Sequence, residues 1–255
     1  MGVIEHNLRE INSLNQRGGR MLSVVDLIED GTLDAETSGL MLSFMAAGAS
    51  FLTAAGPGGV GKTTLMAVLL SFLPPGERIQ TVTDPASIGA PDEPTCWLCH
   101  EIGSGHWYGY LWGREAAQFL ALRESGRIAG SLHADTDEEI AAQLLAPSVG
   151  AAEEDLAAVD LLLTMVRVGG MRRVHTIYES AAPEVADFRP IARWDRGADA
   201  FEITPSEHLP RLRENAPGPV PDVDRATEFV ARLVERRIRH LEDVMTDVAD
   251  FYEGL

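Results

Sequence analysis

The sequence has few basic residues. Its 255 residues include 21 lysines and arginines against 39 aspartates and glutamates, so the formal charge is -18 at pH 7 and the isoelectric point is near 4.7. This charge repels nucleic-acid backbones and anionic lipid surfaces, so we expect no general nucleic-acid binding. Lys62 is the only lysine in the sequence, and all other basic residues in the Lys and Arg total are arginines. That position is expected to need a compact ammonium instead of a planar guanidinium.

Cysteines and long apolar segments are also scarce. Two cysteines cannot form a disulfide framework, and no basic segment followed by an apolar one opens the chain, so we expect a protein of the reducing cytoplasm. The longest apolar run, 40–55, is interrupted by polar residues and is too short to cross a bilayer. Hydrophobic residues still make up 45% of the chain, enough for a buried core in one main domain with an appendage.

A glycine-rich motif surrounds the lysine. Residues 56–64 read GPGGVGKTT, which satisfies G-x-x-x-x-G-K-[ST]. Residues 49–55 suit a buried parallel strand, and residues 65–72 suit a helix that stops at the prolines behind it. In such a loop backbone N–H groups surround a β-phosphate, Lys62 reaches the β and γ oxygens, and Thr63 binds Mg²⁺. The alternative is a glycine-rich turn that binds nothing. The predicted nucleotide contacts are Gly56, Gly58, Gly59, Val60, Gly61, Lys62, Thr63 and Thr64.

Strand and helix patterns alternate along the rest of the chain. Candidate strands are 78–83, 95–102, 127–133, 161–168, 173–178, 188–194 and 201–204. Candidate helices are 22–29, 35–47, 114–125, 136–145 and 152–156. Thr32 or Asp34 is expected to cap the second of these helices. Because the later strands are closely spaced, with Gly169 and Gly170 between two of them, we predict an α/β fold with a mostly parallel sheet that ends in an antiparallel meander.

The composition changes after residue 204. Residues 205–222 are rich in proline and are expected to form a stiff linker. Residues 224–252 are typical of a charged helix, with apolar residues four and three positions apart as in a heptad seam. Such a helix either joins two copies or a partner, or folds back on the sheet. The predicted parts are an N-terminal arm at 1–20, the α/β domain at 21–204, the linker at 205–222 and the C-terminal amphipathic helix at 223–255.

The order of these segments resembles a known family, the type II and type IV secretion and pilus-assembly ATPases. The resemblance starts at 23–33, SVVDLIEDGTL, and continues at 73–84, LPPGERIQTVTD, similar to the family's Asp box. Residues 131–135, SLHAD, are similar to its His box, and 159–179 to the arginine-containing hairpin that follows. The resemblance covers roughly residues 21–204. It implies a RecA-like P-loop ATPase core without the family's usual N-terminal domain.

The resemblance also implies roles for four side chains. Residues 97–102, WLCHEI, are similar to the family's Walker B segment, so Glu101 is the expected acid that holds the metal's water shell or polarises the attacking water. Glu115 is the alternative acid, unless it only interacts with a helix dipole. Asp84 is expected to orient water or metal near the γ-phosphate, unless it only opens a turn. His133 is expected to donate to the γ-phosphate, unless it is a satisfied core histidine.

Several arginines are candidates for charge stabilisation, because the family's arginine after the Walker B acid is replaced here. Surface solvation is the alternative for each. The candidates are Arg114, Arg127 and Arg172. The N-terminal arm, either a remnant of the family's missing domain or a solvated segment, carries Arg9, Arg17 and Arg20.

The segment CWLCH, at 96–100, matches the C-x-x-C-H pattern of haem attachment. On a strand Cys96 and Cys99 point to opposite faces, so they cannot share a porphyrin or form a disulfide. We therefore expect two buried thiols that pack as small apolar side chains. If the segment is not a strand, a zinc site with His100 and His106 is the alternative.

The predicted function is Mg²⁺-dependent ATP hydrolysis that powers a secretion, conjugation or pilus-type assembly. The resemblance implies a homo-oligomeric ring, a hexamer, acting on an integral-membrane platform protein at the cytoplasmic face of a membrane. Two alternatives stay open. One is a nucleotide-binding assembly subunit that does not hydrolyse ATP. The other is a partition or signalling P-loop NTPase, although Pro57 stands where partition ATPases carry a signature lysine.

Overall fold

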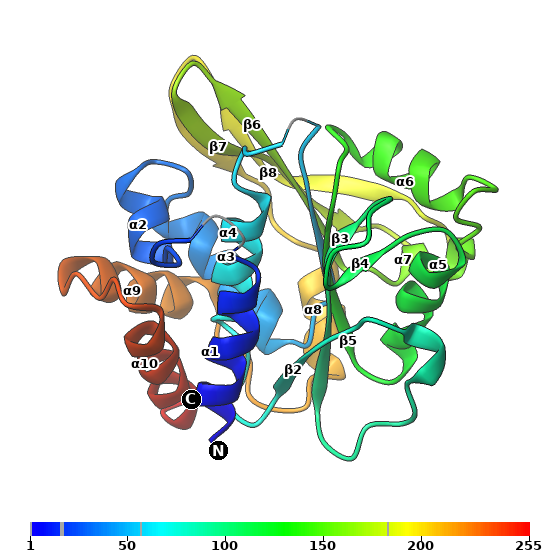
Figure 1. The fold of residues 1–255 in the computed structure, drawn as a ribbon. Helices are drawn as coiled ribbons and strands as arrows, with labels where there is room; N and C mark the ends of the chain where they lie inside the picture. Colours follow the sequence, from blue (N-terminus) through cyan, green and yellow to red (C-terminus); the bar gives the residue numbers. More distant parts are fainter. Residues whose placement is uncertain (1, 16–17, 57, 183) are drawn as a thin grey trace.

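Short, mostly buried runs of residues form a sheet that holds nine strands within the described residues (Figure 1). The structure is a computed structural model that describes residues 2–15, 18–56, 58–182 and 184–255. The strands are β1 (Phe51–Ala54), β2 (Arg78–Thr81), β3 (Thr95–Ile102), β4 (Tyr110–Leu111), β5 (Arg127–Leu132), β6 (Leu161–Val168), β7 (Met171–Ser180), β8 (Phe188–Asp195) and β9 (Ala200–Ile203). Their order across the sheet is β2-β3-β5-β1-β6-β7-β8-β9, with β4 beside β3.

Most neighbouring strands at the centre are parallel. β1 pairs in parallel with β5 and β6, and β3 pairs in parallel with β2, β4 and β5. From β6 to β9 the pairing is antiparallel. The turn between β6 and β7 contains Gly169, whose φ of +61° favours glycine. The predicted fold class is confirmed in its architecture: a mixed α/β fold with a mostly parallel sheet that ends in an antiparallel meander.

Helices cover both faces of the sheet (Figure 1). They are α1 (Val3–Ser13), α2 (Val24–Glu29), α3 (Ala35–Ala46), α4 (Lys62–Leu70), α5 (Arg114–Ala121), α6 (Asp137–Leu145), α7 (Glu153–Ala157), α8 (His208–Glu214), α9 (Val223–Glu235) and α10 (Leu241–Glu253). Two hydrophobic cores result, one with α5, α6 and α7 and one with the other helices. Asp34, one of the two predicted candidates, caps α3. Its side chain accepts a hydrogen bond from the Thr37 N–H at 2.7 Å. None of the helices seen in the described residues is long and apolar enough to cross a bilayer.

The two ends of the chain differ from the prediction. Most of the expected arm is the helix α1, which lies against β2. The expected linker contains α8, and the single helix expected over 224–252 is two helices, α9 and α10. Arg237 has a φ of +54°, a left-handed conformation that an α-helix does not accommodate, so the chain turns back after α9. The domain boundaries themselves stay predictions.

The C-terminal helices pack on the body of the protein. α9 lies against α3, and the Phe229 and Phe251 rings of α9 and α10 stack with centroids 4.3 Å apart. The Tyr252 hydroxyl donates to the backbone oxygen of Phe72, just beyond α4, at 2.8 Å. This region therefore folds back on the same chain, against the helices that cover the sheet.

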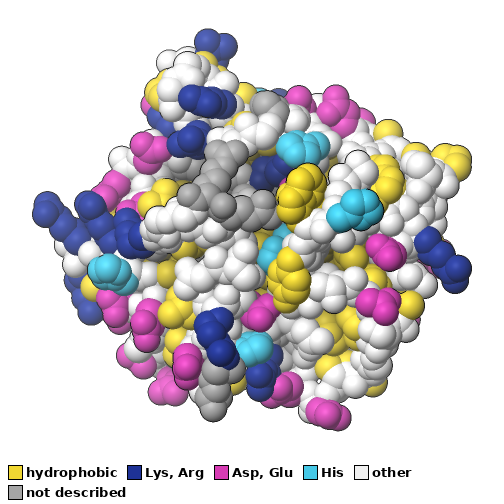
Figure 2. Space-filling model, in the orientation of Figure 1, with side chains coloured by type: hydrophobic (Ala, Val, Ile, Leu, Met, Phe, Trp, Pro, Cys, Tyr) yellow, Lys and Arg dark blue, Asp and Glu magenta, His cyan; other side chains and the backbone are white. Residues whose placement is uncertain are grey.

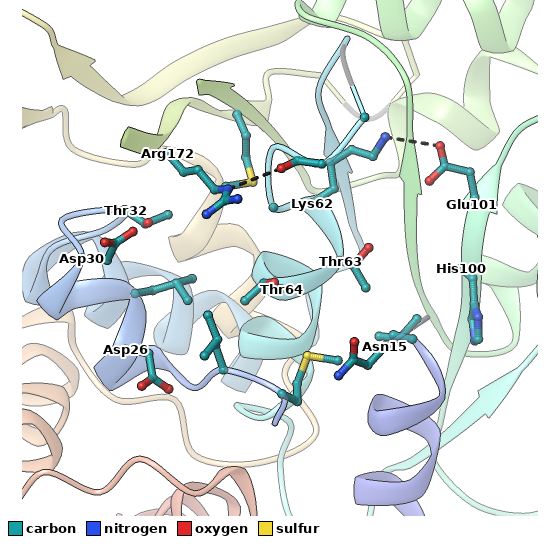
Figure 3. A pocket seen from close by; sticks show the side chains of 18 of the residues that line it. Asn15, Asp26, Asp30, Thr32, Lys62, Thr63, Thr64, His100, Glu101 and Arg172 are labelled. Carbon is teal, nitrogen blue, oxygen red and sulfur yellow. Dashed lines mark hydrogen bonds and ion pairs between the residues drawn. The ribbon is translucent and has the colours of Figure 1, made fainter. Parts of the chain in front are cut away.

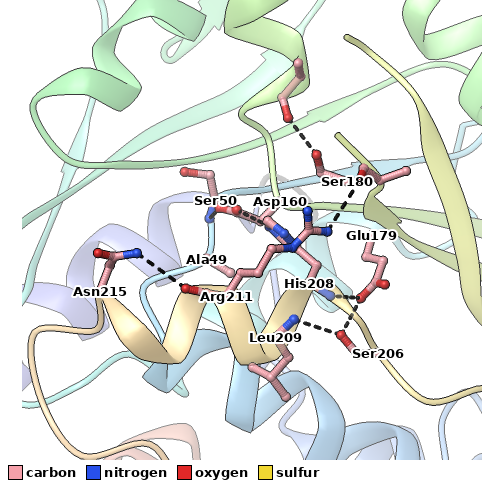
Figure 4. Close-up of polar contacts among 12 residues, drawn as sticks. Ala49, Ser50, Asp160, Glu179, Ser180, Ser206, His208, Leu209, Arg211 and Asn215 are labelled. Carbon is pink, nitrogen blue, oxygen red and sulfur yellow. Dashed lines mark hydrogen bonds and ion pairs between the residues drawn. The ribbon is translucent and has the colours of Figure 1, made fainter. Parts of the chain in front are cut away.

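A buried polar network ties α8 to the sheet (Figure 4). Glu179 of β7 is fully buried and accepts hydrogen bonds from the Ser206 hydroxyl and the His208 backbone N–H. The His208 ring lies 2.7 Å from Asp160, whose other carboxylate oxygen accepts from the Ser50 N–H at 2.7 Å. Since a buried carboxylate is stable only with such partners, these contacts determine where the chain leaves the sheet towards α9.

Candidate functional site

The glycine-rich motif forms the loop between β1 and α4. Gly59 and Gly61 have φ values of +80° and +120°, which residues with a side chain rarely adopt. At Gly56 a Cβ atom would lie 2.3 Å from Oδ2 of Asp135, whose Oδ1 accepts a hydrogen bond from the Gly56 N–H. The path of the backbone therefore requires these glycines. Pro57 lies outside the described residues.

α4 begins at Lys62 with an uncapped first turn. Gly61 precedes the helix, and no side chain of the described residues caps it. The first N–H groups of a helix have no partner inside it, and the helix dipole adds positive charge there. Thr63 and Thr64 follow in the same turn and face the space in front of it. The start of α4 therefore suits an anion such as phosphate.

A pocket of about 640 Å³ opens in front of this turn (Figure 3). Its lining from the loop and α4 consists of Gly58, Gly59, Gly61, Lys62, Thr63 and Thr64. Glu101, His133 and Arg172 line the same end, which we call the phosphate end. Of the other predicted contacts, Val60 is packed in the hydrophobic core, and Gly56 contacts Asp135 instead of lining the pocket.

Three side chains from three elements meet at the phosphate end. Lys62 Nζ lies 3.3 Å from Oε1 of Glu101 and 3.1 Å from Nδ1 of His133. The second oxygen of Glu101 accepts from the Ser131 hydroxyl at 2.7 Å. Burial lowers the pKa of Lys62, and the charge of Glu101 offsets part of that effect. The ammonium is thus partly desolvated beside one carboxylate, which phosphate oxygens can replace.

His133 directly follows β5 and makes contacts through both ring nitrogens. Nδ1 lies 2.9 Å from the backbone oxygen of Gly56, and Nε2 lies 3.1 Å from Oε1 of Glu101. A proton on Nε2 can donate to Glu101, and Nδ1 lies between the Gly56 oxygen, which accepts, and the Lys62 ammonium, which donates. The side chain is 50% exposed and lines the pocket. His133 is therefore placed to contact a ligand in the pocket, and it is not a core histidine.

Arg172 approaches the loop from the β6–β7 hairpin (Figure 3). Its Nε donates to the backbone oxygen of Gly59 at 3.4 Å. The next residue, Arg173, pairs with Asp199 at 2.9 Å, whereas Arg172 has no carboxylate partner within the described part of the chain. Its two terminal nitrogens are therefore available to an anion in the pocket.

Two acids considered from the sequence lie outside the pocket. Asp84 is exposed and caps the short 3₁₀ turn Pro85–Ser87, where it accepts from the Ala86 N–H at 3.2 Å. β2 ends before Asp84, and an aspartate before proline readily opens a turn, so the structure does not bring Asp84 to Lys62. Glu115 is exposed in the first turn of α5 and is not brought to Lys62 either. Of the acids considered, Glu101 is the one that reaches the lysine.

The other two candidate arginines also lie away from the pocket. Arg127 is buried, with Nε 2.5 Å and Nη2 2.7 Å from the two carboxylate oxygens of Glu77. Its Nη1 donates to the backbone oxygen of Met45 at 2.9 Å. Surface solvation is therefore wrong for Arg127, which holds elements of the core together. Arg114 is exposed at the start of α5.

The two cysteines face opposite sides of the sheet, as predicted. Cys96 belongs to the core under α4, and Cys99 to the core under α5. Both thiols are fully buried, which raises their pKa. β3 is a strand throughout, so the condition for the zinc alternative is not met. Over the ranges that the structure describes, no three His, Cys, Asp or Glu side chains are placed to hold a metal.

The other end of the pocket was not predicted. Its wall comes from α2, the end of α1 and their connection, with the lining residues Leu14, Asn15, Met21, Leu22, Asp26, Leu27, Asp30 and Thr32. Burial alone would raise the pKa of Asp26, but hydrogen bonds from Arg20 and the Ser23 N–H lower it. Arg17 lies outside the described residues. The residues of 23–33 predict a helix and resemble a family segment, but nothing in them shows that this segment approaches the loop.

No protein-family model matches this chain, and no curated protein matches it. Among solved structures, it is similar to the VirB11 ATPase of the Brucella suis type IV secretion system, solved in complex with sulphate. The two chains are 18% identical, with a TM-score of 0.40 over 60% of this chain and 54% of that one. The likeness is distant. This chain spans about half the length of that structure.

Proposed function

We propose that this protein binds ATP with Mg²⁺ and hydrolyses it. The observation that carries the proposal is the place of the single lysine. Lys62 begins α4 at an uncapped turn behind glycines of positive φ, and its ammonium lies 3.3 Å from Glu101 in a pocket that Arg172 also lines. Backbone N–H groups, a lysine and an arginine around one space are the groups that bind phosphate.

The two ends of the pocket suit the two ends of a nucleotide. Lys62, Arg172 and the first turn of α4 supply positive charge for the phosphates. The opposite wall includes the apolar side chains of Met21, Leu22 and Leu27, which suit a base. A volume of about 640 Å³ is in the range of small-molecule sites.

The residues at the phosphate end also fit Mg²⁺. This ion prefers oxygen ligands and is commonly held by phosphates together with one or two protein oxygens. The Thr63 hydroxyl would supply a direct ligand, and Glu101 would hold the water shell. When bound, Mg²⁺ neutralises charge on the β- and γ-phosphates.

Glu101 must separate from Lys62 before it acts as a base. When phosphate oxygens take the ammonium, Oε1 of Glu101 becomes free to accept a proton from the attacking water. Ser131 keeps its hydrogen bond to the other oxygen, so the carboxylate stays oriented. His133 is close enough to Glu101, at 3.1 Å, to donate to the γ-phosphate in the same space.

We infer further that hydrolysis powers a secretion, conjugation or pilus-type assembly. The ordered resemblance of residues 21–204 supports this role, and with it a hexameric ring of this chain that acts on an integral-membrane platform at the cytoplasmic face. Sedimentation of the purified protein tests the ring. We expect a hexamer mass with a non-hydrolysable ATP analogue and Mg²⁺, and a monomer in every condition would contradict it.

A nucleotide-binding assembly subunit without turnover is the second candidate. One observation favours it: Asp84 lies outside the pocket, which leaves Glu101 to serve both the metal's water shell and the attacking water. Phosphate release from Mg·ATP, with EDTA as control, separates the candidates. Turnover that stops with EDTA supports the ATPase, and tight binding without turnover supports the assembly subunit. A chain that neither binds nor hydrolyses ATP overturns both.

A further inference from the structure

α1 occupies an edge of the sheet. β2 is the edge strand, and α1 lies along it (Figure 1). Asn7 Nδ2 donates to the Glu77 backbone oxygen at 2.8 Å, and Asn7 Oδ1 accepts from the Ile79 N–H at 2.8 Å. One buried carboxamide thus takes the donor and acceptor roles that a neighbouring strand would have.

Two further side chains of α1 make contacts with β2. Glu10 Oε2 accepts from the Thr81 hydroxyl at 2.6 Å and from the Thr81 N–H at 3.2 Å. The His6 ring contacts the Ile79 backbone oxygen at 2.8 Å. These contacts fix the helix in one register along β2, because each depends on a particular side chain of α1 meeting a particular backbone group.

The same contacts reach the strand that carries Glu101. Thr81 Oγ1 lies 3.2 Å from Nε2 of His100, the residue before Glu101 in β3. Ser13, at the end of α1, lies 3.4 Å from the same nitrogen. α1 is thus connected to the strand of the proposed base.

The last residues of this segment face the pocket. Leu14 and Asn15 both line it, and Figure 3 shows Asn15 beyond the end of α1, on the opposite side of Thr63 from Lys62. The C-terminal end of a helix carries partial negative charge, which disfavours phosphates and suits an uncharged base or ribose. Asn15 Nδ2 donates to the Gly19 oxygen at 2.9 Å, and its side-chain oxygen, which has no partner among the described residues, can accept from an N–H or O–H group of a ligand.

We propose, on the basis of the proposed nucleotide binding, that the end of α1 contacts the nucleoside part of the ligand and that Asn7 and Glu10 are positioning residues for this contact. Their hydrogen bonds to β2 hold Leu14 and Asn15 against the base and ribose. Loosening α1 therefore weakens binding of the nucleoside and leaves binding of the phosphates unchanged, since Lys62 and Arg172 do not belong to this segment.

The test compares two ligands by calorimetry on the full chain, each with Mg²⁺: a non-hydrolysable ATP analogue and inorganic tripolyphosphate, which lacks the nucleoside. We expect Asn7→Ala and Asn15→Ala to weaken binding of the analogue about tenfold. Their affinity for tripolyphosphate is expected to equal that of the native chain. Asn12→Ala, an exposed position on the same helix, is the matched control and is expected to change neither affinity.

The outcomes separate this inference from the function on which it rests. A native chain that binds neither ligand overturns the nucleotide function itself. If the native chain binds both and Asn15→Ala alters neither affinity, the nucleoside contact of α1 is wrong. Equal losses for both ligands in Asn7→Ala would show a general structural effect and overturn its positioning role. Asn15→Ala keeps the hydrogen bonds between α1 and β2, so it remains informative even if Asn7→Ala does not fold.

Discussion

Lys62 and Glu101 are ion-paired at 3.3 Å, although they belong to α4 and β3. β5 separates β1 from β3 in the sheet, so the lysine that follows β1 extends past the end of β5, where His133 lies. In the proposed mechanism a phosphate competes with Glu101 for the ammonium and ends this pair. Binding of the triphosphate and release of the proposed base are therefore one event in this account.

Replacing Glu101 by glutamine should stop turnover and preserve binding. The amide keeps the shape of the side chain but cannot take a proton from water, and a general base contributes about 10²- to 10⁴-fold to a rate. We expect phosphate release to fall at least about a hundredfold. The matched control is Glu115→Gln, an exposed acid outside the pocket, which should retain the native rate. Native turnover in Glu101→Gln would rule out the base.

Arg172→Ala should weaken binding of the ATP analogue. A hydrogen bond to a charged group contributes about 1.5–3 kcal/mol, so the loss should be tenfold or more. Arg167→Ala is the matched control, because Arg167 is the exposed cross-strand partner of Arg172 and does not line the pocket. Calorimetric titration of both variants measures the difference. Equal affinities would mean that Arg172 does not contact the ligand.

Arg127→Met should destabilise the fold. It leaves the Glu77 carboxylate buried without its cation, which costs about 3–5 kcal/mol in the free energy of unfolding. The double variant Arg127→Met, Glu77→Leu should recover most of this loss, since no charge is then left buried. Urea denaturation measures both. Arg232→Ala, in an exposed pair with Glu228, should change stability by less than about 0.5 kcal/mol.

The stability of the native chain should fall between pH 7 and pH 5 through His100. Burial lowers the pKa of His100 to about 4, although the charge of Glu10 opposes the shift. Below a pH of about 6.5 the unfolded chain binds a proton that the folded chain does not, so the folded state loses stability as the pH falls. The His100→Gln variant has no imidazole at this position, so it does not lose stability in this way. Urea denaturation at the two pH values should show a loss larger by about 2 kcal/mol in the native chain, and equal losses would contradict the assignment.

Features with local causes were predictable from the sequence. The loop at Gly59 and Gly61 requires glycine whatever surrounds it, and the bounds of β3 follow from one continuous buried run. Glu101 and His133 lie together at the carboxyl ends of parallel strands, which agrees with the roles near the γ-phosphate that the resemblance implies for both.

Features that depend on distant partners were not predictable. The charge of Arg127 favours the surface, and only its pairing with Glu77 makes burial favourable. The docking of α1 depends on Asn7 meeting the backbone of β2, which no local pattern indicates. The break at Arg237 interrupts a regular heptad pattern, and the two helices that result both bury apolar side chains in the same core.

The proposed function requires a contact between Lys62 and a triphosphate. Calorimetry with Mg²⁺ and the non-hydrolysable ATP analogue, on native protein, Lys62→Ala and Lys62→Arg, tests this contact, and circular dichroism checks that each variant is folded. Losing a buried, hydrogen-bonded charge contact costs about 2–5 kcal/mol, so Lys62→Ala should bind on the order of a hundredfold more weakly. Lys62→Arg should also bind weakly, because a guanidinium does not replace a compact ammonium. Native affinity in a folded Lys62→Ala variant would contradict the account.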